Sequence, residues 1–362
     1  MSDHDVVPVN SVIVGDCIEV MAAWPDATFD LIFADPPYNL QLRNELWRPN
    51  ESLVDAVDDA WDKIGSFADY DRFSRAWLSE CRRLLKPNGA IWVIGTYHNI
   101  YRLGALMQDL GFWFLNDVVW VKSNPMPNFR GVRLTNAHET LIWAARSDRS
   151  RHTFNHHAAK TFNGGKQLRS DWRLPICCGS ERLKADGRKL HSTQKPEALI
   201  ERIVVISTRP GDLILDPFFG SGTTGAVAKR LQRRWVGIER EPTYAEAARR
   251  RIADVIPDPL LAGDERRRPE RIPFRTLVER GILRPGQTLC FRRDSSLQAV
   301  VTSSGHLRRG AEEGSIHRLG SSLSNGAPCN GWDHWYFEAE DGTLQPIGTL
   351  REMLRDLDRT QG

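Results

Sequence analysis

The sequence predicts a doubly wound α/β fold with a mostly parallel sheet, followed by a small C-terminal α+β domain. Short apolar runs alternate with segments of helical periodicity, and a glycine-rich turn joins one of these runs to a helix. A stretch rich in proline and charge then separates the last part of the chain from the rest. With 362 residues, 41% of them hydrophobic, the chain is long enough for one large core and a smaller second domain.

The elements of the first domain follow from these two periodicities. Apolar runs suited to buried strands cover residues 11–15, 29–34, 90–95, 117–121, 139–144, 213–216 and 235–239. Helical periodicity covers residues 67–86, 98–110, 197–208, 221–232 and 242–254, and the first of these helices is expected to end at Lys86-Pro87-Asn88-Gly89. Because strands and helices alternate, the residues that follow the strands are expected to share one edge of the sheet, where ligands bind.

The domain boundary is predicted in a linker, 257–272, between a first domain, 1–256, and a second, 273–362. The second domain is interpreted as a helix near 274–283, several short strands, a turn at Asn325-Gly326 and an aromatic strand over 332–337. In this domain His317 is interpreted as a structural or phosphate-contacting histidine, and Cys329 as a structural thiol. The domain itself is either a DNA-binding accessory or a stabilising, dimer-forming appendage.

The first candidate site is Asp35-Pro36-Pro37-Tyr38, directly after the run 29–34. Two successive prolines fix φ and donate no backbone NH, so the carbonyls of Asp35 and Pro36 are expected to point outward as acceptors. Together with the Asp35 carboxylate they would accept the hydrogens of one amino group, and the Tyr38 ring would stack on a nucleobase lifted out of a duplex. The alternative is a Pro-Pro loop with a capping Asp.

The second candidate site is a glycine turn between the run 213–216 and the helix at 221–232. The spacing from Gly220 to Gly225 fits a dinucleotide-binding turn, and Glu239 stands where an acid that holds ribose hydroxyls is expected. This pattern predicts an adenosine-containing cofactor and suits a nicotinamide dehydrogenase as well. Asp216 before the turn favours a nucleoside that bears a methionine, because its carboxylate can face an ammonium group.

Taken in this order, the two sites resemble those of the S-adenosylmethionine-dependent DNA amino-methyltransferases of the β class. That class has a permuted Rossmann-like methyltransferase fold, in which the Asp-Pro-Pro-Tyr element precedes the Phe-x-Gly-x-Gly element. Gly15-Asp16-Cys17 resembles the segment that lies by the cofactor's adenine, and the segment from His191 to Pro196 resembles the one by its methionine end. The resemblance implies direct methyl transfer to a flipped base, without a covalent enzyme intermediate.

The predicted site residues follow from the motifs and this resemblance. The catalytic set is Asp35, Pro36, Pro37 and Tyr38. The set that binds S-adenosylmethionine is Asp16, Cys17, His191, Thr193, Lys195, Asp216, Phe218, Gly220, Ser221, Gly222, Thr223 and Glu239.

A closer resemblance links nearly the whole chain to the cell-cycle-regulated adenine methyltransferases, through residues 67–111, 122–129 and the C-terminal part. It implies methylation of the exocyclic amine of adenine in duplex G-A-N-T-C sites, and a homodimer. Methylation of the cytosine 4-amino group, of protein glutamine, or no catalysis at all in a DNA-binding regulator remain open alternatives, as does the dehydrogenase.

Charge is distributed unevenly along the chain. Residues 1–60 contain two basic and twelve acidic side chains, whereas residues 122–195 contain fifteen basic and five acidic ones. Residues 266–293 add nine arginines against two glutamates. Basic blocks of this kind indicate a phosphate-backbone partner. The segment 40–66 is polar and acidic and too long for a plain connection, and the segment 145–195 lacks clean periodicity. Both are predicted to contact double-stranded DNA, with candidate contacts at Arg48, Trp61, Asn124, Asn128, Arg130 and Arg133.

Several classes of protein are not expected. No run of eighteen apolar residues exists and the acidic start lacks the basic region of a signal peptide, so a cytoplasmic, nucleoid-associated protein without membrane contact is predicted. The six cysteines show no paired CxxC spacing, so we expect free thiols and no metal site.

Overall fold

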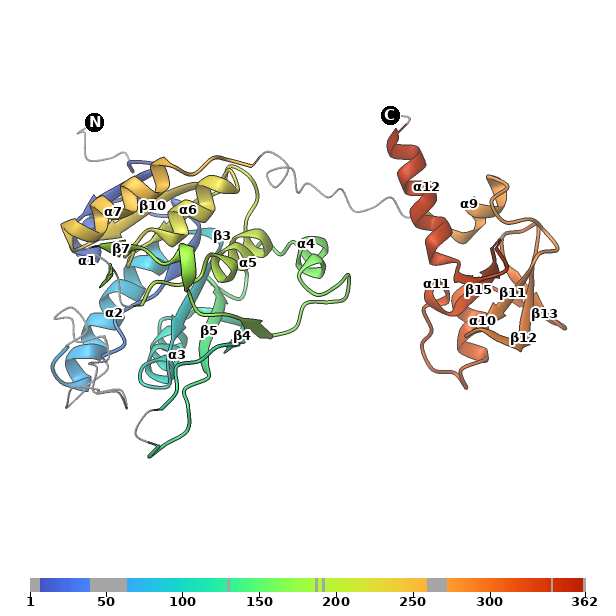
Figure 1. The fold of residues 1–362 in the computed structure, drawn as a ribbon, viewed down its shortest axis with the longest axis horizontal. Helices are drawn as coiled ribbons and strands as arrows, with labels where there is room; N and C mark the ends of the chain where they lie inside the picture. The colour runs from blue at the N-terminus through green and yellow to red at the C-terminus, as the bar shows by residue number, and fades with distance from the viewer. Residues whose placement is uncertain are drawn as a thin grey trace. The chain divides into compact units, whose positions relative to one another are not determined.

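The computed structural model describes residues 7–39, 64–128, 131–185, 188–190, 193–258, 272–339 and 341–360. The chain separates into two compact units, unit 1 (1–266) and unit 2 (267–362), and each is described by itself (Figure 1). The division falls inside the segment 257–272, although residues 259–271 lie outside the described part. The exact boundaries of the two domains stay a prediction.

Unit 1 is built on an eight-stranded sheet. In spatial order its strands are β1 (Ser11–Val14), β10 (Arg234–Glu239), β9 (Leu213–Asp216), β2 (Phe29–Ala34), β3 (Leu85–Gly95), β5 (His138–Ala145), β4 (Trp113–Lys122) and β6 (Asp171–Leu174). Neighbours from β1 to β3 pair in parallel, β5 is antiparallel to both β3 and β4, and β6 is parallel to β4. The predicted α/β fold with a mostly parallel sheet is confirmed.

Helices cover both faces of this sheet. They are α1 (Cys17–Ala22), α2 (Phe67–Leu84), α3 (Ile100–Asp109), α4 (His156–Thr161), α5 (Glu197–Ser207), α6 (Thr223–Arg230) and α7 (Pro242–Ala253) (Figure 1). Leu31 and Phe33 of β2 pack into one core with α5, α6 and α7, whereas Ile32 and Ala34 pack into a second core with α1, α2 and α3. Successive side chains of a strand point to opposite faces, so burial on both faces explains why the run is apolar throughout.

The junction between α2 and β3 differs from the prediction. Ser66 and Asp69 form a capping box that starts α2, with Asp69 N donating to Ser66 Oγ at 3.2 Å and Ser66 N to Asp69 Oδ2 at 2.9 Å. The helix ends at Leu84, not at residue 86, and Leu85 already pairs with Phe29. Residues 86–89, predicted as the helix end, lie within β3, where its register with β2 shifts. Proline cannot continue a helix, so the helix ends before Pro87.

Short elements were absent from the prediction. In the aperiodic segment 145–195 the structure places α4, β6, a 3₁₀ turn (Gly179–Glu181) and a small hairpin of β7 (Lys184–Ala185) and β8 (Arg188–Lys189). Elements of two to six residues do not span enough of a period to be read from sequence.

Unit 2 contains a six-stranded antiparallel sheet with helices. Its strands, in spatial order, are β14 (Glu312–Gly314), β13 (Leu307–Arg309), β12 (Asp294–Val301), β11 (Thr288–Phe291), β15 (Trp335–Glu338) and β16 (Leu344–Pro346). Its helices are α9 (Phe274–Glu279), α10 (Ile316–Ser322), α11 (Gly331–His334) and α12 (Gly348–Thr360). Leu277, Phe291, Leu319 and Trp335 belong to one separate core.

Two predicted elements of unit 2 were wrong in extent. The helix expected over 274–283 ends at Glu279. The strand expected over 332–337 begins only at Trp335, because residues 331–334 form α11, and the close approach of Gly331 to the Ile316 carbonyl leaves no room for a side chain there. The turn at Asn325-Gly326 is present, with both residues at positive φ. His317 accepts a hydrogen bond at Nδ1 from Gly331 N at 3.1 Å, which agrees with a structural role, and its contact with phosphate stays a prediction.

Within the described residues, no helix is both long and apolar enough to cross a bilayer.

Candidate active site

The carboxyl ends of four adjacent strands bring the sequence motifs together. Ile32 of β2 pairs with Leu215 of β9, so the residues that follow, Asp35 and Asp216, lie at neighbouring strand ends. β10 lies on the other side of β9 and ends at Glu239, which pairs with Val14 of β1. In this sheet the chain runs from β2 to β3 on one side and from β9 to β10 on the other, so the order of the strands changes direction between β9 and β2. Open α/β sheets bind their ligands at such a switch point.

The Asp35-Pro36-Pro37-Tyr38 loop is held from the side of α2 and α3. Tyr70 Oη donates to the Pro37 carbonyl at 2.9 Å, and Asn99 Nδ2 donates to Tyr70 Oη at 3.1 Å. Both Tyr70 and Asn99 are buried. The second proline carbonyl is thereby used to fix the loop on the protein.

Two residues of this loop, Asp35 and Tyr38, form a buried charge cluster together with Lys122, Glu139 and Lys195. Lys195 Nζ lies 2.6 Å from Asp35 Oδ2 and 3.9 Å from Glu139 Oε2, and Lys122 Nζ lies 2.8 Å from Glu139 Oε1. Tyr38 Oη is 3.0 Å from both Asp35 Oδ1 and Glu139 Oε2. Two carboxylates and two ammonium groups therefore balance each other in a site largely removed from solvent.

Tyr38, the ring on which a flipped base is predicted to stack, is part of this cluster. Its side chain lies in the interior, since the residue is only 7% exposed, and Lys195 Nζ lies 5.1 Å from its ring centroid. Its hydroxyl points into the buried charge cluster. The stacking of a base on this ring stays a prediction.

Burial and pairing shift the pKa values of the cluster in opposite directions. Burial raises the pKa of the Asp35 carboxyl, and Lys195 offsets part of that rise. Burial alone would raise the pKa of Glu139, but the ammonium groups of Lys195 and Lys122 hold it below its ordinary value. Burial alone would lower the pKa of Lys195, but the Asp35 and Glu139 carboxylates raise it.

The glycine turn is organised by two carboxylates. Asp216 accepts from Phe218 N at 3.0 Å and from Thr224 Oγ1 at 2.6 Å. Glu239 accepts from Gly220 N at 2.6 Å through one oxygen and from Glu241 N at 2.8 Å through the other. Each carboxylate oxygen has two lone pairs, so both groups shape the turn and keep capacity for a ligand's donors.

Gly222 must be glycine on two grounds. It has a φ of 76°, in the left-handed region, and a Cβ there would lie 2.7 Å from the Ala248 Cβ of α7. Gly237 of β10 gives room to the Phe219 ring, whose atoms lie within 2.3 Å of where a Cβ would stand, and this ring stacks on Trp235. The turn is therefore fixed against α7 and β10 by close packing.

The other residues predicted to bind the cofactor lie around this turn. Asp16 caps α1 by accepting from Ile18 N at 2.9 Å, and Cys17 is buried, which raises its pKa to about 12. Phe218 packs edge-on against Trp77 of α2. Ser221 and Thr223 are buried at the start of α6.

Thr223 Oγ1 donates to the Lys195 carbonyl at 3.3 Å, and the Thr193 carbonyl lies 3.4 Å from Lys195 Nζ. Lys195 thus contacts the glycine turn through its backbone and Asp35 through its side chain. His191 lies outside the described residues.

The carboxylates at this edge outnumber their cationic partners. Asp216 and Glu239 form no salt bridge with any described residue, and burial raises the pKa of Asp216 to about 7 and raises that of Glu239 as well. Asp35 also contributes to the rise at Asp216. A ligand with a positively charged sulfonium and ammonium group relieves this excess of negative charge, so the residues present fit S-adenosylmethionine.

The residues predicted to contact DNA are only partly brought to one place. Asn128 Nδ2 donates to the Arg133 carbonyl at 3.0 Å, and Arg133 Nη1 donates to Tyr97 Oη at 2.9 Å, so both belong to the β4–β5 loop (residues 123–137) beside the start of α3. Asn124 accepts from Ile176 N at 2.9 Å through its side-chain oxygen, and its contact with DNA stays a prediction. Arg48, Trp61 and Arg130 lie outside the described residues.

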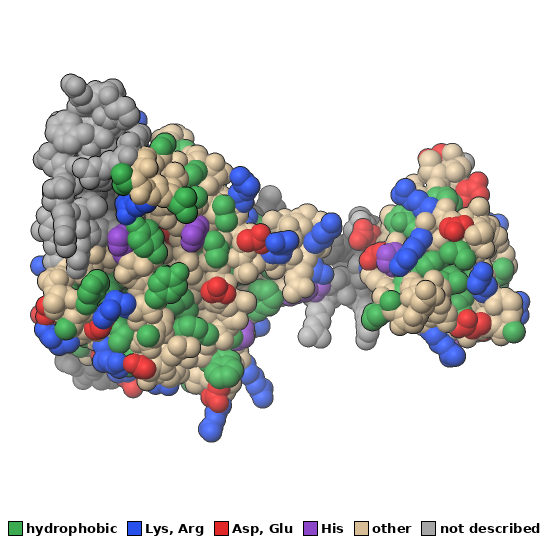
Figure 2. All heavy atoms as spheres, turned by 90° about the horizontal axis from the view of Figure 1, so that it is seen from below, with side chains coloured by type: hydrophobic (Ala, Val, Ile, Leu, Met, Phe, Trp, Pro, Cys, Tyr) green, Lys and Arg blue, Asp and Glu red, His purple; other side chains and the backbone are tan. Residues whose placement is uncertain are grey.

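The surface around the β4–β5 loop mixes charge with exposed apolar groups. Figure 2 shows the side of unit 1 toward which this loop extends in Figure 1, with Lys and Arg, His and hydrophobic side chains close together. Val132 is 79% exposed and Leu134 is 92% exposed. Of the fifteen basic residues in 122–195, however, Lys122 and Lys195 face the interior, so the sequence overstated the exposed charge of this block.

Three residues of the site were missed by sequence reasoning. Glu139 and Lys122 stand at the ends of apolar runs, and a charge in such a position is a signal in the sequence that could have identified them. Arg251 of α7 contacts the Ser221 carbonyl, Thr223 Oγ1 and Glu197, and so ties the glycine turn to the start of α5. Nothing in the local pattern of α7 distinguishes Arg251 from its arginine neighbours.

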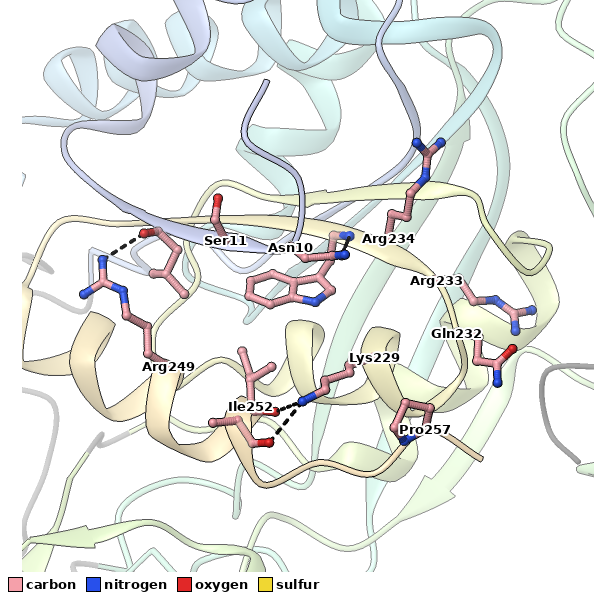
Figure 3. Close-up of a pocket in the computed structure, with 12 residues that line it drawn as sticks. Asn10, Ser11, Lys229, Gln232, Arg233, Arg234, Arg249, Ile252 and Pro257 are labelled. Atoms are coloured by element: carbon pink, nitrogen blue, oxygen red, sulfur yellow. Dashed lines mark hydrogen bonds between the residues drawn. The ribbon is translucent and has the colours of Figure 1, made fainter. Parts of the chain in front are cut away.

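A separate pocket of about 680 Å³ lies at the opposite, amino-terminal edge of the sheet, between β1, β10, α6 and α7 (Figure 3). Its cations are used for packing: Lys229 Nζ donates to the Ile252 and Ala253 carbonyls and Arg249 to the Val12 carbonyl. This pocket is not part of the site formed by the motifs.

Two family models match the chain. The model described as DNA methylase matches residues 29–250, which include the Asp35 loop, the glycine turn and Glu239. The model described as Restriction Enzyme Adenine Methylase Associated matches residues 257–357.

The chain is also similar to individual proteins. Over 333 residues the chain is 46% identical to the type II methyltransferase M.HinfI of Haemophilus influenzae, covering 91% of this chain and 92% of that protein. Among solved structures, the PvuII DNA methyltransferase (cytosine-N4-specific) matches 68% of this chain and 88% of its own, with 22% identity and a TM-score of 0.53, which is a likeness of fold. The M1.HpyAVI complex with SAM matches 67% of this chain and 98% of its own, with 28% identity and a TM-score of 0.49.

Proposed function

The chain belongs to the N6/N4 DNA methylase family, whose members are site-specific DNA methyltransferases with S-adenosylmethionine as cofactor, and we propose that it methylates the 6-amino group of adenine in duplex DNA. The placement of Asp35 at a strand end next to Asp216 carries this proposal, because an amine acceptor and a cofactor turn then share one edge. The adenine assignment is supported by the likeness to cell-cycle-regulated adenine methyltransferases and by the description of the model that matches residues 257–357.

The catalytic role of the loop follows from the chemistry of an aromatic amine. The lone pair of this nitrogen is delocalised into the ring, so the amine is a poor nucleophile. Asp35 and the Pro36 carbonyl accept the two amine hydrogens, which favours a tetrahedral nitrogen and stabilises the positive charge that develops there. One well-placed electrostatic contact of this kind contributes on the order of 3 kcal/mol, about a hundredfold in rate.

Glu239, Gly220 and Asp216 form the proposed cofactor site. Glu239 accepts from the ribose hydroxyls, the backbone of the glycine turn approaches the ligand closely, and the Asp216 carboxylate stabilises its positive charges. When bound, S-adenosylmethionine supplies an electrophilic methyl group on a sulfonium. The residues of the chain align the amine with it, and this alignment accounts for most of the remaining acceleration.

The target base is reached by flipping it out of the duplex, since no exocyclic amine can enter this edge while it is stacked. The β4–β5 loop, with Asn128 and Arg133, and the basic segment 266–293 contact the duplex. Recognition of G-A-N-T-C, a homodimer and a cytoplasmic, nucleoid-associated location belong to the same proposal, on the likeness to the cell-cycle-regulated enzymes.

Methylation of duplex DNA with labelled S-adenosylmethionine, followed by mapping of the modified base, tests the proposal. We expect label on the 6-amino group of adenine in G-A-N-T-C and none in a duplex that lacks this sequence. Label on the 4-amino group of cytosine would contradict the base assignment, label on adenine in another sequence would contradict the site, and absence of any transfer would leave a DNA-binding protein without catalysis.

A further inference from the structure

Glu139 occupies a position in the buried charge cluster that no motif assigns. It stands in β5, is 7% exposed, and has three partners from three different parts of the chain. Lys122 fixes its Oε1 at 2.8 Å, and its Oε2 faces Tyr38 Oη at 3.0 Å and Lys195 Nζ at 3.9 Å. Glu139 is thus a second carboxylate within reach of the lysine that pairs with Asp35.

Both oxygens of Asp35 already have a donor group within hydrogen-bond distance. Its Oδ2 is 2.6 Å from Lys195 Nζ, and its Oδ1 is 3.0 Å from Tyr38 Oη. Each Asp35 oxygen keeps a lone pair for an amine hydrogen, but an ammonium at 2.6 Å neutralises the carboxylate and makes it a weaker acceptor, so the amine is held more strongly when Lys195 moves away. A buried ammonium that leaves its carboxylate needs another carboxylate, because an uncompensated charge is strongly disfavoured in the interior.

We propose that Glu139 is a positioning residue for methyl transfer, which receives the Lys195 ammonium when the target amine binds Asp35. This inference rests on the proposed function. Lys195 Nζ lies 2.6 Å from Asp35 Oδ2 and 3.9 Å from Glu139 Oε2. The shift of Nζ toward Glu139 is therefore close to the difference between these two distances. The freed Oδ2 of Asp35 then accepts a hydrogen from the amine.

The Tyr38 hydroxyl can change its carboxylate partner when Lys195 changes its own. A hydroxyl has one hydrogen and can donate it to only one of its two carboxylate neighbours at a time. While Lys195 pairs with Asp35, the Tyr38 hydroxyl donates its hydrogen bond to Glu139. When Lys195 pairs with Glu139, the hydroxyl donates to Asp35. Two carboxylates and two ammonium groups remain in the cluster throughout, so no net charge is created in the interior.

The test compares Glu139→Gln with Glu139→Asp and with a control. Glu139→Gln removes the second carboxylate but keeps an acceptor for Lys122, and Glu139→Asp restores the charge. Asp30→Asn is the matched control, because Asp30 also pairs with a lysine, Lys86, at 2.7 Å, but at the amino end of β2 and away from the site. We expect kcat to fall at least tenfold in Glu139→Gln, to recover in part in Glu139→Asp and to stay near wild type in Asp30→Asn.

A second measurement separates positioning from folding. 2-Aminopurine lacks the 6-amino group, so extrusion of this base, followed by its fluorescence in a duplex, does not require Asp35 to be freed. Glu139→Gln should extrude 2-aminopurine as wild type does while adenine turnover falls. The double variant Glu139→Gln with Lys122→Met keeps the cluster neutral, so we expect it to fold even if the unpaired lysine prevents folding of the single variant. It should show the same low kcat.

The pH profile of kcat reports whether the charge of Glu139 acts on Asp35. The charged or titratable groups around Asp35 are Tyr38, Lys122, Glu139, Arg182, Lys195 and Asp216. The negative charge of Glu139 raises the pKa of Asp35, so its removal lowers that pKa. The acid limb of the profile should therefore move to lower pH in Glu139→Gln even though the plateau is lower.

Wild-type kcat in the Glu139→Gln variant, or a lower kcat with an unchanged acid limb and equal loss of 2-aminopurine extrusion, would overturn this inference alone. Failure of the wild-type protein to methylate any duplex would instead overturn the proposed function. The two failures are distinguished by the wild-type control in the same assay.

Discussion

Lys195 Nζ lies 2.6 Å from Asp35 Oδ2, although the two residues are 160 positions apart in the chain. The carbonyl of the same lysine accepts a hydrogen bond from Thr223 in the glycine turn. The likeness to the β class implied a place for Lys195 at the methionine end of the cofactor. Its contacts join the Asp35 loop to the glycine turn.

The first prediction concerns the amine acceptor. Asp35→Ala should lower kcat by at least about a hundredfold, since one electrostatic contact to the reacting nitrogen is lost. Lys195 keeps Glu139 as a partner, so we expect the fold and duplex binding to persist, measured by thermal melting and by gel shift. Near-normal turnover in the variant would remove Asp35 from the catalytic set.

The second prediction concerns the cofactor's ribose. Glu239→Ala should raise the Kd for S-adenosylmethionine by roughly ten- to a hundredfold, because hydrogen bonds to a charged acceptor contribute about 1.5–3 kcal/mol. Titration calorimetry measures this directly. Glu241→Ala, a carboxylate exposed two residues away, serves as control and should leave the Kd unchanged. Equal affinity in the two variants would count against the ribose role.

The third prediction uses the pKa of Asp216, which burial raises to about 7. A folded-state pKa above the unfolded value means that the group's favourable contribution is complete below about pH 4 and is lost as the pH rises toward 7. Asp216→Asn avoids this loss, so in the absence of cofactor it should be stabilised relative to wild type more at pH 8 than at pH 5. Thermal melts at the two pH values measure the difference.

The same substitution should weaken cofactor binding at pH 8, where the wild-type carboxylate is charged and attracts the ligand's positive groups. A variant that is neither stabilised nor weaker in binding at pH 8 would show that Asp216 is not a buried carboxylate facing the cofactor.

The fourth prediction concerns the glycine turn. Gly222→Ala should destabilise the protein by about 1–3 kcal/mol from backbone strain alone, with a further cost from its contact with Ala248. Gly211→Ala is the matched control, because Gly211 has a φ of 84° but no atom within 4 Å of a Cβ. Denaturant unfolding of both variants isolates the steric part, and equal losses would mean that α7 moves away to make room.

The fifth prediction concerns DNA contact. Arg133→Ala should raise the KM for duplex several-fold and reduce the slope of log K against log salt by about one, because one phosphate contact is lost. Arg75→Ala on α2, whose side chain is half exposed and pairs with Asp109, is the control. Binding measured from 50 to 200 mM salt tests this, and parallel slopes for wild type and Arg133→Ala would place Arg133 outside the interface.

Much of the fold was predictable from local pattern. The runs 29–34 and 213–216 are β2 and β9 as predicted, because strands buried on both faces are apolar throughout and are ended by polar or proline residues. The short elements α1, α4 and β6 were missed, since they are too brief to show a period. The start of β15 was predicted too early because Trp332 of α11 stands shortly before the aromatic residues of β15 in the sequence.

By itself the sequence determined the residue types of the site and their order along the chain: the Asp35 loop, the glycine turn and the acid at Glu239. Only the tertiary structure decided which charges meet, namely that Lys195 faces Asp35 and that Glu139 and Lys122 complete the cluster. A turn or a strand depends on neighbours a few residues apart, whereas an ion pair across the sheet depends on the order in which distant strands are placed side by side.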